Sequence, residues 1–160
     1  MGSNLPRVRI RRAQVEHLPY LIEHSEAKKW ANAERTLANH IKAGFAWTGY
    51  AKMPEGWVMG AMWGILPRSL CGDEAWLWLV ITDLIRVNPF LFVRHSHRAI
   101  ALTFKHYPKI TASVEEGNEK AERWLKWLGA TVDQNVITDI VYGTRVKPVV
   151  MHRENLRIRT

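Results

Sequence analysis

Positively charged side chains are the most prominent chemical feature of this 160-residue sequence, and they gather toward both ends. The first group is Arg7, Arg9, Arg11 and Arg12, and the last is Lys147, Arg153, Arg157 and Arg159. With 23 Lys and Arg against 15 Asp and Glu, the formal net charge is +8. Such a surplus indicates an anionic partner: a nucleic acid, an acidic protein surface or a phosphate-rich small molecule. A solvated basic surface that only aids solubility explains the same charge.

Few other side chains are spaced for catalysis or metal binding. His95 and His97 are two residues apart, which would turn them away from each other on a helix, so we expect no metal site. Cys71 is the only cysteine, which excludes an intrachain disulfide and favours a reducing, cytoplasmic setting. The sequence contains no P-loop, no dinucleotide fingerprint and no Gly-x-Ser-x-Gly elbow.

Composition predicts one globular domain over residues 1–160, with a short basic tail from about residue 151. The chain is 47% apolar and 24% charged, which excludes wholesale disorder. Its longest apolar stretch, Ala75–Ile81, is too short to cross a bilayer, and the N-terminus lacks the apolar core of a signal peptide. No internal repeat or linker composition divides the chain.

Apolar spacing predicts the elements that would position these residues. Strands are expected at 8–12, 45–51, 56–66, 74–82 and 109–114, and two more within 131–150 with a turn near Gly143. Helices are expected at 15–24, 33–41, 95–107 and 119–128. The order β-α-α-β-β-β-α-β-α-β-β predicts an α/β (mixed α+β) fold, with a twisted sheet of about six to seven strands flanked by about four helices.

The helix at 119–128 has the clearest pattern. Its apolar residues repeat at i, i+3, i+4 and i+7 from Ala121 to Leu128, with charged residues on the other face. Asn118 is a suitable N-cap, and Gly129 suits the position after the helix.

The stretch Glu116–Ala130 resembles the strand-to-helix segment of the GNAT (Gcn5-related N-acetyltransferase) superfamily: Asn-x-x-Ala, an amphipathic helix, then Gly and an aromatic or small residue. The predicted element order is also the one that this family uses, so the resemblance covers nearly the whole chain. The run Trp-Leu-Lys-Trp-Leu-Gly from Trp124, with Tyr107-Pro108 before it, looks like small GNAT-like proteins of tailed bacteriophages, some of which are virion components.

The resemblance implies that acetyl-CoA is the acyl donor. In the family, the pantetheine arm lies between two separating strands, which here would be 76–82 and 110–114. The backbone of Leu79, Val80 and Ile81 would then contact the arm, and one of these N–H groups would polarise the thioester carbonyl. The resemblance also implies that Asn118 contacts the cofactor.

The family's phosphate loop reads Gln/Arg-x-x-Gly-x-Gly/Ala before a helix, and the best match is Arg94-His95-Ser96-His97-Arg98-Ala99. The first and last residues fit, but His97 replaces a glycine, and its side chain would obstruct the phosphates. Alternatively, Arg94, His95, Ser96 and Arg98 supply side-chain donors in place of bare backbone. A third reading is that these polar residues only cap a helix and face water.

The acid and base of acetyl transfer are less clearly marked. Many members carry a Tyr that protonates the departing thiolate, but the matching position here is Leu125. Tyr142 and Tyr107 are substitutes, although each also suits a packing role. Asp83 and Glu74, at the two ends of the expected strand 74–82, are the carboxylates that would take the proton of the acceptor amine.

Together these observations predict an N-acetyltransferase that moves an acetyl group from acetyl-CoA to an unidentified amine, on a small molecule or a protein, by direct attack. The alternative is a catalytically degenerate GNAT-fold bacteriophage protein that acts as a virion or host-interaction module, located in the host cytoplasm or the virion. Nucleic acid is the less favoured partner, because the Arg-rich strand 8–12 matches no known nucleic-acid module.

Overall fold

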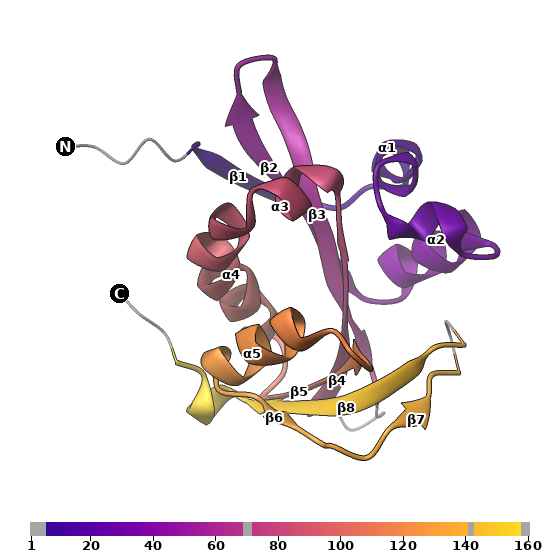
Figure 1. The fold of residues 1–160 in the computed structure, drawn as a ribbon, viewed down its shortest axis with the longest axis vertical. Helices are drawn as coiled ribbons and strands as arrows, with labels where there is room; N and C mark the ends of the chain where they lie inside the picture. The colour runs from indigo at the N-terminus through magenta and orange to yellow at the C-terminus, as the bar shows by residue number, and fades with distance from the viewer. Residues whose placement is uncertain (1–5, 69–71, 141–142, 158–160) are drawn as a thin grey trace. The chain divides into compact units, whose positions relative to one another are not determined.

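The computed structural model describes residues 6–68, 72–140 and 143–157, and its strands form a mixed sheet (Figure 1). The strands are β1 (Val8–Arg12), β2 (Phe45–Met53), β3 (Gly56–Pro67), β4 (Glu74–Ile81), β5 (Lys109–Glu115), β6 (Thr131–Val132), β7 (Ile137–Thr138) and β8 (Arg145–His152). Their order is β1-β2-β3-β4-β5-β8-β6, and β7 also pairs with β8. The β4–β5 pair is parallel, whereas β1–β2, β2–β3 and the pairs made by β8 are antiparallel.

The described helices are α1 (Leu18–Glu23), α2 (Ala33–Ala43), α3 (Asp83–Val87), α4 (Pro89–Phe104) and α5 (Glu119–Leu128). The predicted mixed α/β architecture is therefore confirmed. The described residues form eight strands and five α-helices, where about six to seven strands and about four helices were predicted. None of the described helices combines the length and the apolar character needed to span a bilayer.

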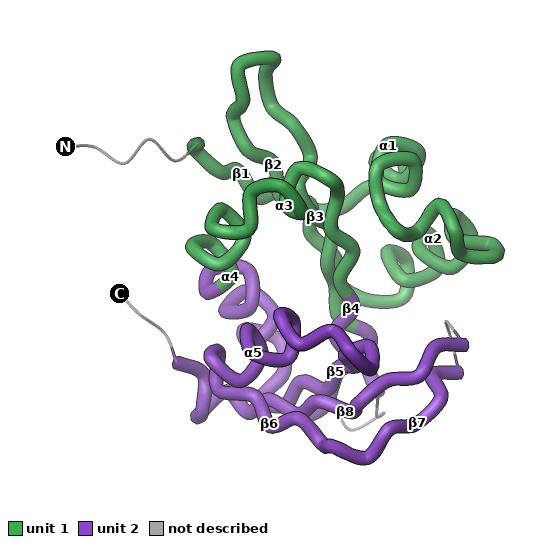
Figure 2. Tube along the Cα trace, viewed as in Figure 1, with its two compact units in different colours: residues 1–65, 79–96 green, residues 66–78, 97–160 purple. Residues whose placement is uncertain are grey.

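The chain divides into two compact units, shown in different colours in Figure 2. The N-terminal unit contains residues 1–65 and 79–96, and the C-terminal unit contains residues 66–78 and 97–160. The chain passes between the units three times, within β3, within β4 and within α4.

The N-terminal unit is built on the antiparallel strands β1, β2 and β3. The helices α1 and α2 lie on one side of these strands and α3 lies on the other (Figure 1). Leu18, Leu21 and Leu37 of α1 and α2 are completely buried. Full burial of an aliphatic side chain contributes about 1.5–3 kcal/mol, so these leucines hold the helical layer in place. On the other side, Ile85 of α3 is so close to the sheet that a Cβ at Gly60 would lie 3.1 Å from its Cδ1.

The C-terminal unit is built on the pairing of β5 with β8. All seven residues of β5 pair antiparallel with β8, from Lys109 with His152 to Glu115 with Val146. The helix α5 follows β5 with the predicted bounds. The Oδ1 atom of Asn118 accepts the Ala121 N–H at its start, and Gly129 ends it in a left-handed conformation.

Two sequence predictions about elements were wrong. The helix expected at 95–107 begins at Pro89 instead, because proline suits the first position of a helix. The five-residue helix α3 before it was not predicted. In the last part of the chain, the first of two expected strands is divided into the two-residue strands β6 and β7. The turn near Gly143 is confirmed, since its N–H donates to the Asp139 carbonyl and its φ is +70°.

Candidate active site

The parallel pairing of β4 with β5 covers only the first part of each strand. The pairs are Glu74 with Lys109, Ala75 with Ile110, and Trp76 with Thr111. The parallel ladder ends at Trp76 and Thr111, although β5 continues to Glu115. Pairing along the full length would have excluded a ligand between these strands, and that pairing does not occur in the described residues.

The second half of β4 belongs to the N-terminal unit and is held firmly there. Val80 is 4% exposed, and Ile81 packs against a buried cluster of Ala51, Ile85 and Leu91. Leu79 points the other way and is 37% exposed. The Thr82 hydroxyl, next along the chain, donates to the Met59 carbonyl at 2.8 Å. The three residues predicted to contact the cofactor therefore lie at the end of β4 that belongs to the N-terminal unit.

The predicted phosphate loop at Arg94–Ala99 does not exist as a loop. All six residues lie in the interior of α4, where backbone N–H groups bond to carbonyls of the preceding turn. The Ser96 hydroxyl donates to the Val93 carbonyl at 2.9 Å, inside the same helix. The backbone amides of this segment are therefore not available to phosphates. Any phosphate contact must come from the side chains, of which Arg94 and Arg98 are exposed.

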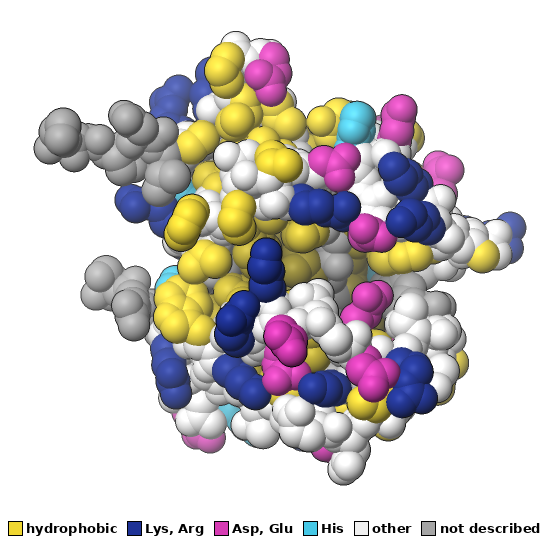
Figure 3. All heavy atoms as spheres, in the orientation of Figure 1, with side chains coloured by type: hydrophobic (Ala, Val, Ile, Leu, Met, Phe, Trp, Pro, Cys, Tyr) yellow, Lys and Arg dark blue, Asp and Glu magenta, His cyan; other side chains and the backbone are white. Residues whose placement is uncertain are grey.

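The true start of α4 is a poor anion site. Its first residue, Pro89, has no N–H group, and the Leu91 N–H donates to the Asn88 carbonyl at 3.1 Å. The side chains here are apolar and open to solvent: Val87 is 73% exposed and Phe90 is 79% exposed. Hydrophobic side chains gather over α3 and the start of α4 in Figure 3. A diphosphate would find neither a glycine loop nor a row of free amides there.

His97, which replaces the usual glycine, has its side chain against α5. The ring centroids of His97 and Trp127 are 4.5 Å apart, with 58° between the ring planes. The His97 Nε2 atom is buried and has no hydrogen-bond partner among the described residues. This imidazole therefore contributes to packing within the C-terminal unit.

The predicted catalytic residues lie in separate settings. Asp83 is an exposed first residue of α3 in the N-terminal unit, 4.0 Å from Arg86. Glu74 begins β4 in the C-terminal unit, and its Oε2 atom lies 3.7 Å from the Lys109 Nζ atom. Tyr142 lies outside the described residues.

The position of the missing family tyrosine is apolar and enclosed. Leu125, on the inner face of α5, is 5% exposed. Leucine has no proton to donate, so a departing thiolate would receive no help from this position.

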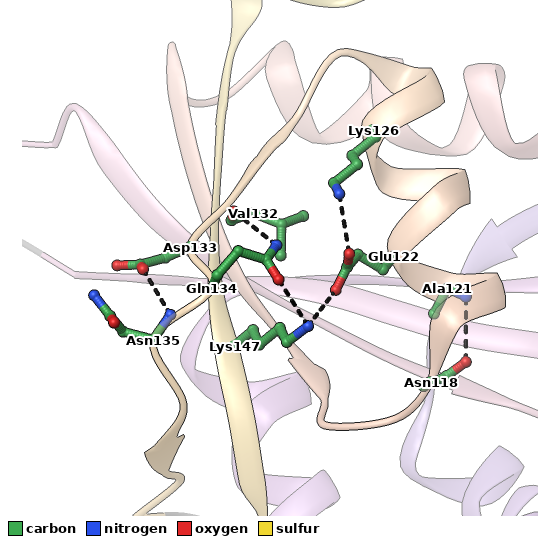
Figure 4. A network of polar contacts seen from close by, with 9 residues as sticks. All are labelled: Asn118, Ala121, Glu122, Lys126, Val132, Asp133, Gln134, Asn135 and Lys147. Atoms are coloured by element: carbon green, nitrogen blue, oxygen red, sulfur yellow. Dashed lines mark hydrogen bonds and ion pairs between the residues drawn. The ribbon is translucent and has the colours of Figure 1, made fainter.

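Asn118, carried over as a cofactor contact, lies beside a network of charged side chains (Figure 4). The two carboxylate oxygens of Glu122 accept from Lys126 at 3.0 Å and from Lys147 at 2.9 Å. Lys147 also donates to the Gln134 side chain at 3.0 Å. The hydrogen bond from Lys147, together with that from Lys126, lowers the pKa of Glu122 to about 2. The network joins α5 to β8.

A polar cluster in the N-terminal unit was missed by the sequence reasoning. The Nδ1 atom of His17 accepts the Gln14 N–H at 3.2 Å and lies 3.1 Å from the hydroxyl of Thr48, which is fully buried. Tyr50 lies beside His17 in an edge-to-face arrangement, with 6.0 Å between ring centroids. These residues come from different parts of the sequence, so spacing carried no signal for the cluster.

Comparison with solved structures decides the fold. A chimera of the Vibrio cholerae spermidine N-acetyltransferase SpeG and hSSAT matches with a TM-score of 0.70 and 13% identity, over 92% of this chain and 96% of that chain. The chain has the GNAT fold. The GNAT fold is also that of the SpeG structure with manganese ions, which matches with a TM-score of 0.66 and 12% identity over 91% of this chain and 92% of that one. The sequence matches no protein-family model and no curated protein.

Proposed function

We propose that the chain is an N-acetyltransferase that takes its acetyl group from acetyl-CoA and passes it to an amine. The observation that carries this proposal is the short β4–β5 pairing, three residue pairs long within a GNAT fold. Two parallel strands that stop pairing leave backbone groups that an extended pantetheine arm can use.

In the proposed reaction, the amine nitrogen attacks the thioester carbonyl carbon, the carbon–sulfur bond breaks, and the thiolate leaves. A backbone N–H of Leu79, Val80 or Ile81 would stabilise the developing oxyanion. Asp83 or Glu74, through water where needed, would take the amine proton. A thiol has a pKa of about 8.5, so the thiolate can leave without an acid, and Leu125 slows the step rather than preventing it.

The nucleotide end of CoA does not fit as well as the pantetheine arm. Arg94–Ala99 has its amides inside α4, and the start of α4 has Pro89 where a free N–H would serve. We therefore propose that the pantetheine arm supplies most of the affinity. Acetyl-CoA should bind no more than about tenfold more tightly than acetylpantetheine, since two exposed arginine contacts contribute about 1 kcal/mol together.

The acceptor is proposed to be neutral or acidic. The similar solved structures are named as spermidine N-acetyltransferases, and spermidine is a polycation. A chain with a net charge of +8 repels a polycation at long range and attracts an anion. An amine on an acidic peptide or protein is therefore a better acceptor for this chain than a polyamine.

A second candidate function is a GNAT-fold interaction module without catalysis, with a virion or host protein as its partner. The placement of His97 favours it, because the imidazole packs on Trp127 where the family has a glycine beside phosphates. The apolar, exposed start of α4, with Val87 and Phe90, favours a protein contact over a diphosphate.

Calorimetric titration of the full chain with acetyl-CoA and with acetylpantetheine tests the proposal. We expect both to bind, with dissociation constants within about tenfold of each other. Binding of neither compound would reject the transferase proposal and leave the interaction module. A preference of 100-fold or more for acetyl-CoA would show that a phosphate site exists and that the affinity argument is wrong.

A further inference from the structure

The strand β1 has an open outer edge. It stands at one end of the strand order and pairs with β2 alone among the described strands. The Lys52 N–H donates to the Arg7 carbonyl, and the Ala13 N–H donates to the Ala46 carbonyl, so odd-numbered residues bond to β2. In an antiparallel ladder the alternate residues then direct their N–H and C=O groups away from the partner. These residues are Val8, Ile10 and Arg12.

A side-chain contact marks the open edge independently. The Arg11 guanidinium donates to the Ile10 carbonyl at 3.3 Å, which shows that this carbonyl faces outward rather than toward β2. No backbone hydrogen bond to the outward groups of Val8, Ile10 or Arg12 occurs within the part of the chain that the structure describes. The edge can therefore bond to one further strand.

The cations of β1 and of the neighbouring strand β2 have no carboxylate partners among the described residues. They are Arg7, Arg9, Arg11 and Arg12 of β1 and its approach, together with Lys52 of β2. All five are exposed, and the described residues provide no ion pair to any of them. Figure 3 shows Lys and Arg side chains at the upper left, where Figure 1 draws β1 and the β2–β3 hairpin.

Part of this charge lies over the ring of Trp57, a residue of β3. The Arg9 guanidinium carbon lies 4.2 Å from the ring centroid, that of Arg7 lies 6.0 Å away, and the Lys52 Nζ atom lies 5.9 Å away. Stacking on an indole leaves the N–H groups around the edge of a guanidinium free to bind oxygen. Arg7 and Arg9 are two residues apart on one face, which corresponds to about 6.8 Å along a strand.

We propose that the outer edge of β1 binds an extended acidic segment of a partner protein as an additional strand. Carboxylates at alternate positions of that segment have the same spacing as Arg7, Arg9 and Arg11, because the bound segment and β1 are both extended strands. The outward backbone groups of Val8 and Ile10 supply the strand-to-strand hydrogen bonds. This inference does not depend on acetyl transfer.

Other occupants suit the edge less well. A second copy would place arginines opposite arginines, which destabilises a strand pair. The phosphates of a nucleic acid would bind the cations. They would not form strand-like hydrogen bonds with the alternating N–H and C=O groups, which are the second feature of the site. An apolar strand would leave all five cations unpaired.

The first test uses fluorescence anisotropy with labelled peptides on the full chain at low salt. The probes are a peptide alternating Glu and Val, an isomer with the same residues in two blocks, and single-stranded DNA of equal charge. The alternating peptide should bind at least about fivefold more tightly than either control. Equal binding of the two peptides, or tighter binding of DNA, would overturn the proposal and indicate a nonspecific basic surface.

The second test separates the backbone edge from the side chains. Ile10→Pro removes one outward N–H, and Ile10→Ala removes the same side-chain contacts but keeps the N–H. We expect Ile10→Pro to bind the alternating peptide about threefold to tenfold more weakly than Ile10→Ala, the effect of one lost hydrogen bond. Arg9→Gln should weaken binding of the alternating peptide by up to about fivefold. Arg123→Gln lowers the net charge of the chain by the same amount, and it should leave the affinity unchanged. Identical affinities within either matched pair would refute strand addition at β1.

Discussion

Gly129 is the position where a single added methyl group should do the most damage. It ends α5 with a φ of +107°, a backbone conformation that costs an L-residue about 1–2 kcal/mol. A Cβ at this position would also collide with the carbonyl oxygen of Asn155. The Asn155 carbonyl cannot move freely, because the backbone two residues later is fixed. There the Arg157 N–H donates to the Leu128 carbonyl at 3.0 Å.

Gly117 is a matched control in the same unit. Its φ is +89°, and a Cβ there would meet no atom within 4 Å. Gly117→Ala should therefore cost only the backbone term, about 1–2 kcal/mol. Gly129→Ala should cost that term plus about 1–3 kcal/mol for the forced shift of a packed backbone, a total of about 2–5 kcal/mol.

Thermal unfolding followed by circular dichroism measures both variants against the wild type. At about 2–4 °C per kcal/mol for a chain of this size, the melting temperature of Gly117→Ala should fall by about 2–8 °C, and that of Gly129→Ala by about 2–12 °C more. Equal losses in the two variants would show that the Asn155 carbonyl does not restrict Gly129, and would refute the reasoning.

Three further changes test the charged and apolar residues near the proposed site. Glu122→Gln removes a carboxylate whose pKa is lowered from 4.5 to about 2 by Lys147 and Lys126, so its stabilisation is present above pH 4.5 and is lost as the pH falls toward 2. The stability gap between the wild type and Glu122→Gln should close over that range in acid titrations, and a gap that stays constant would contradict the assignment. Arg94→Ala should weaken acetyl-CoA binding by about twofold to threefold and leave acetylpantetheine unaffected in parallel titrations. Leu125→Tyr should raise the acetylation rate, by up to about 10²-fold where the hydroxyl reaches the thiolate. The same change should lower the melting temperature, because a phenol enters an apolar face. An unchanged rate would show that the missing acid does not limit turnover.

Local signals account for the elements that the sequence predicted best. The helix α5 carries a capping Asn118, an apolar repeat and a terminal Gly129, which all act within a few residues of one another. The start of α4 was not predicted because Asn88-Pro89 is a common loop signal. Proline is also frequent in the first turn of a helix, which is where Pro89 lies. The short helix α3 has no repeat long enough to be read from spacing.

The site was harder to predict because its contacts join distant residues. The sequence shows that His97 replaces a glycine, but not that its ring packs on Trp127, thirty residues later. Similarly, the contact between His17 of η1 (Val15–His17) and Thr48 of β2 joins residues 31 positions apart. The cations of β1 were visible as a run of arginines, whereas the open backbone edge depends on the register with β2.

The most direct test of acetyl transfer is the release of free thiol from acetyl-CoA by the full chain, measured with and without an acceptor. The acceptors are an acidic peptide with a free amine, a basic peptide of equal length, and spermidine. We predict amine-dependent thiol release that is fastest with the acidic peptide, because the net charge of +8 concentrates acidic acceptors. Thiol release that no amine raises above the rate without an acceptor would contradict acetyl transfer.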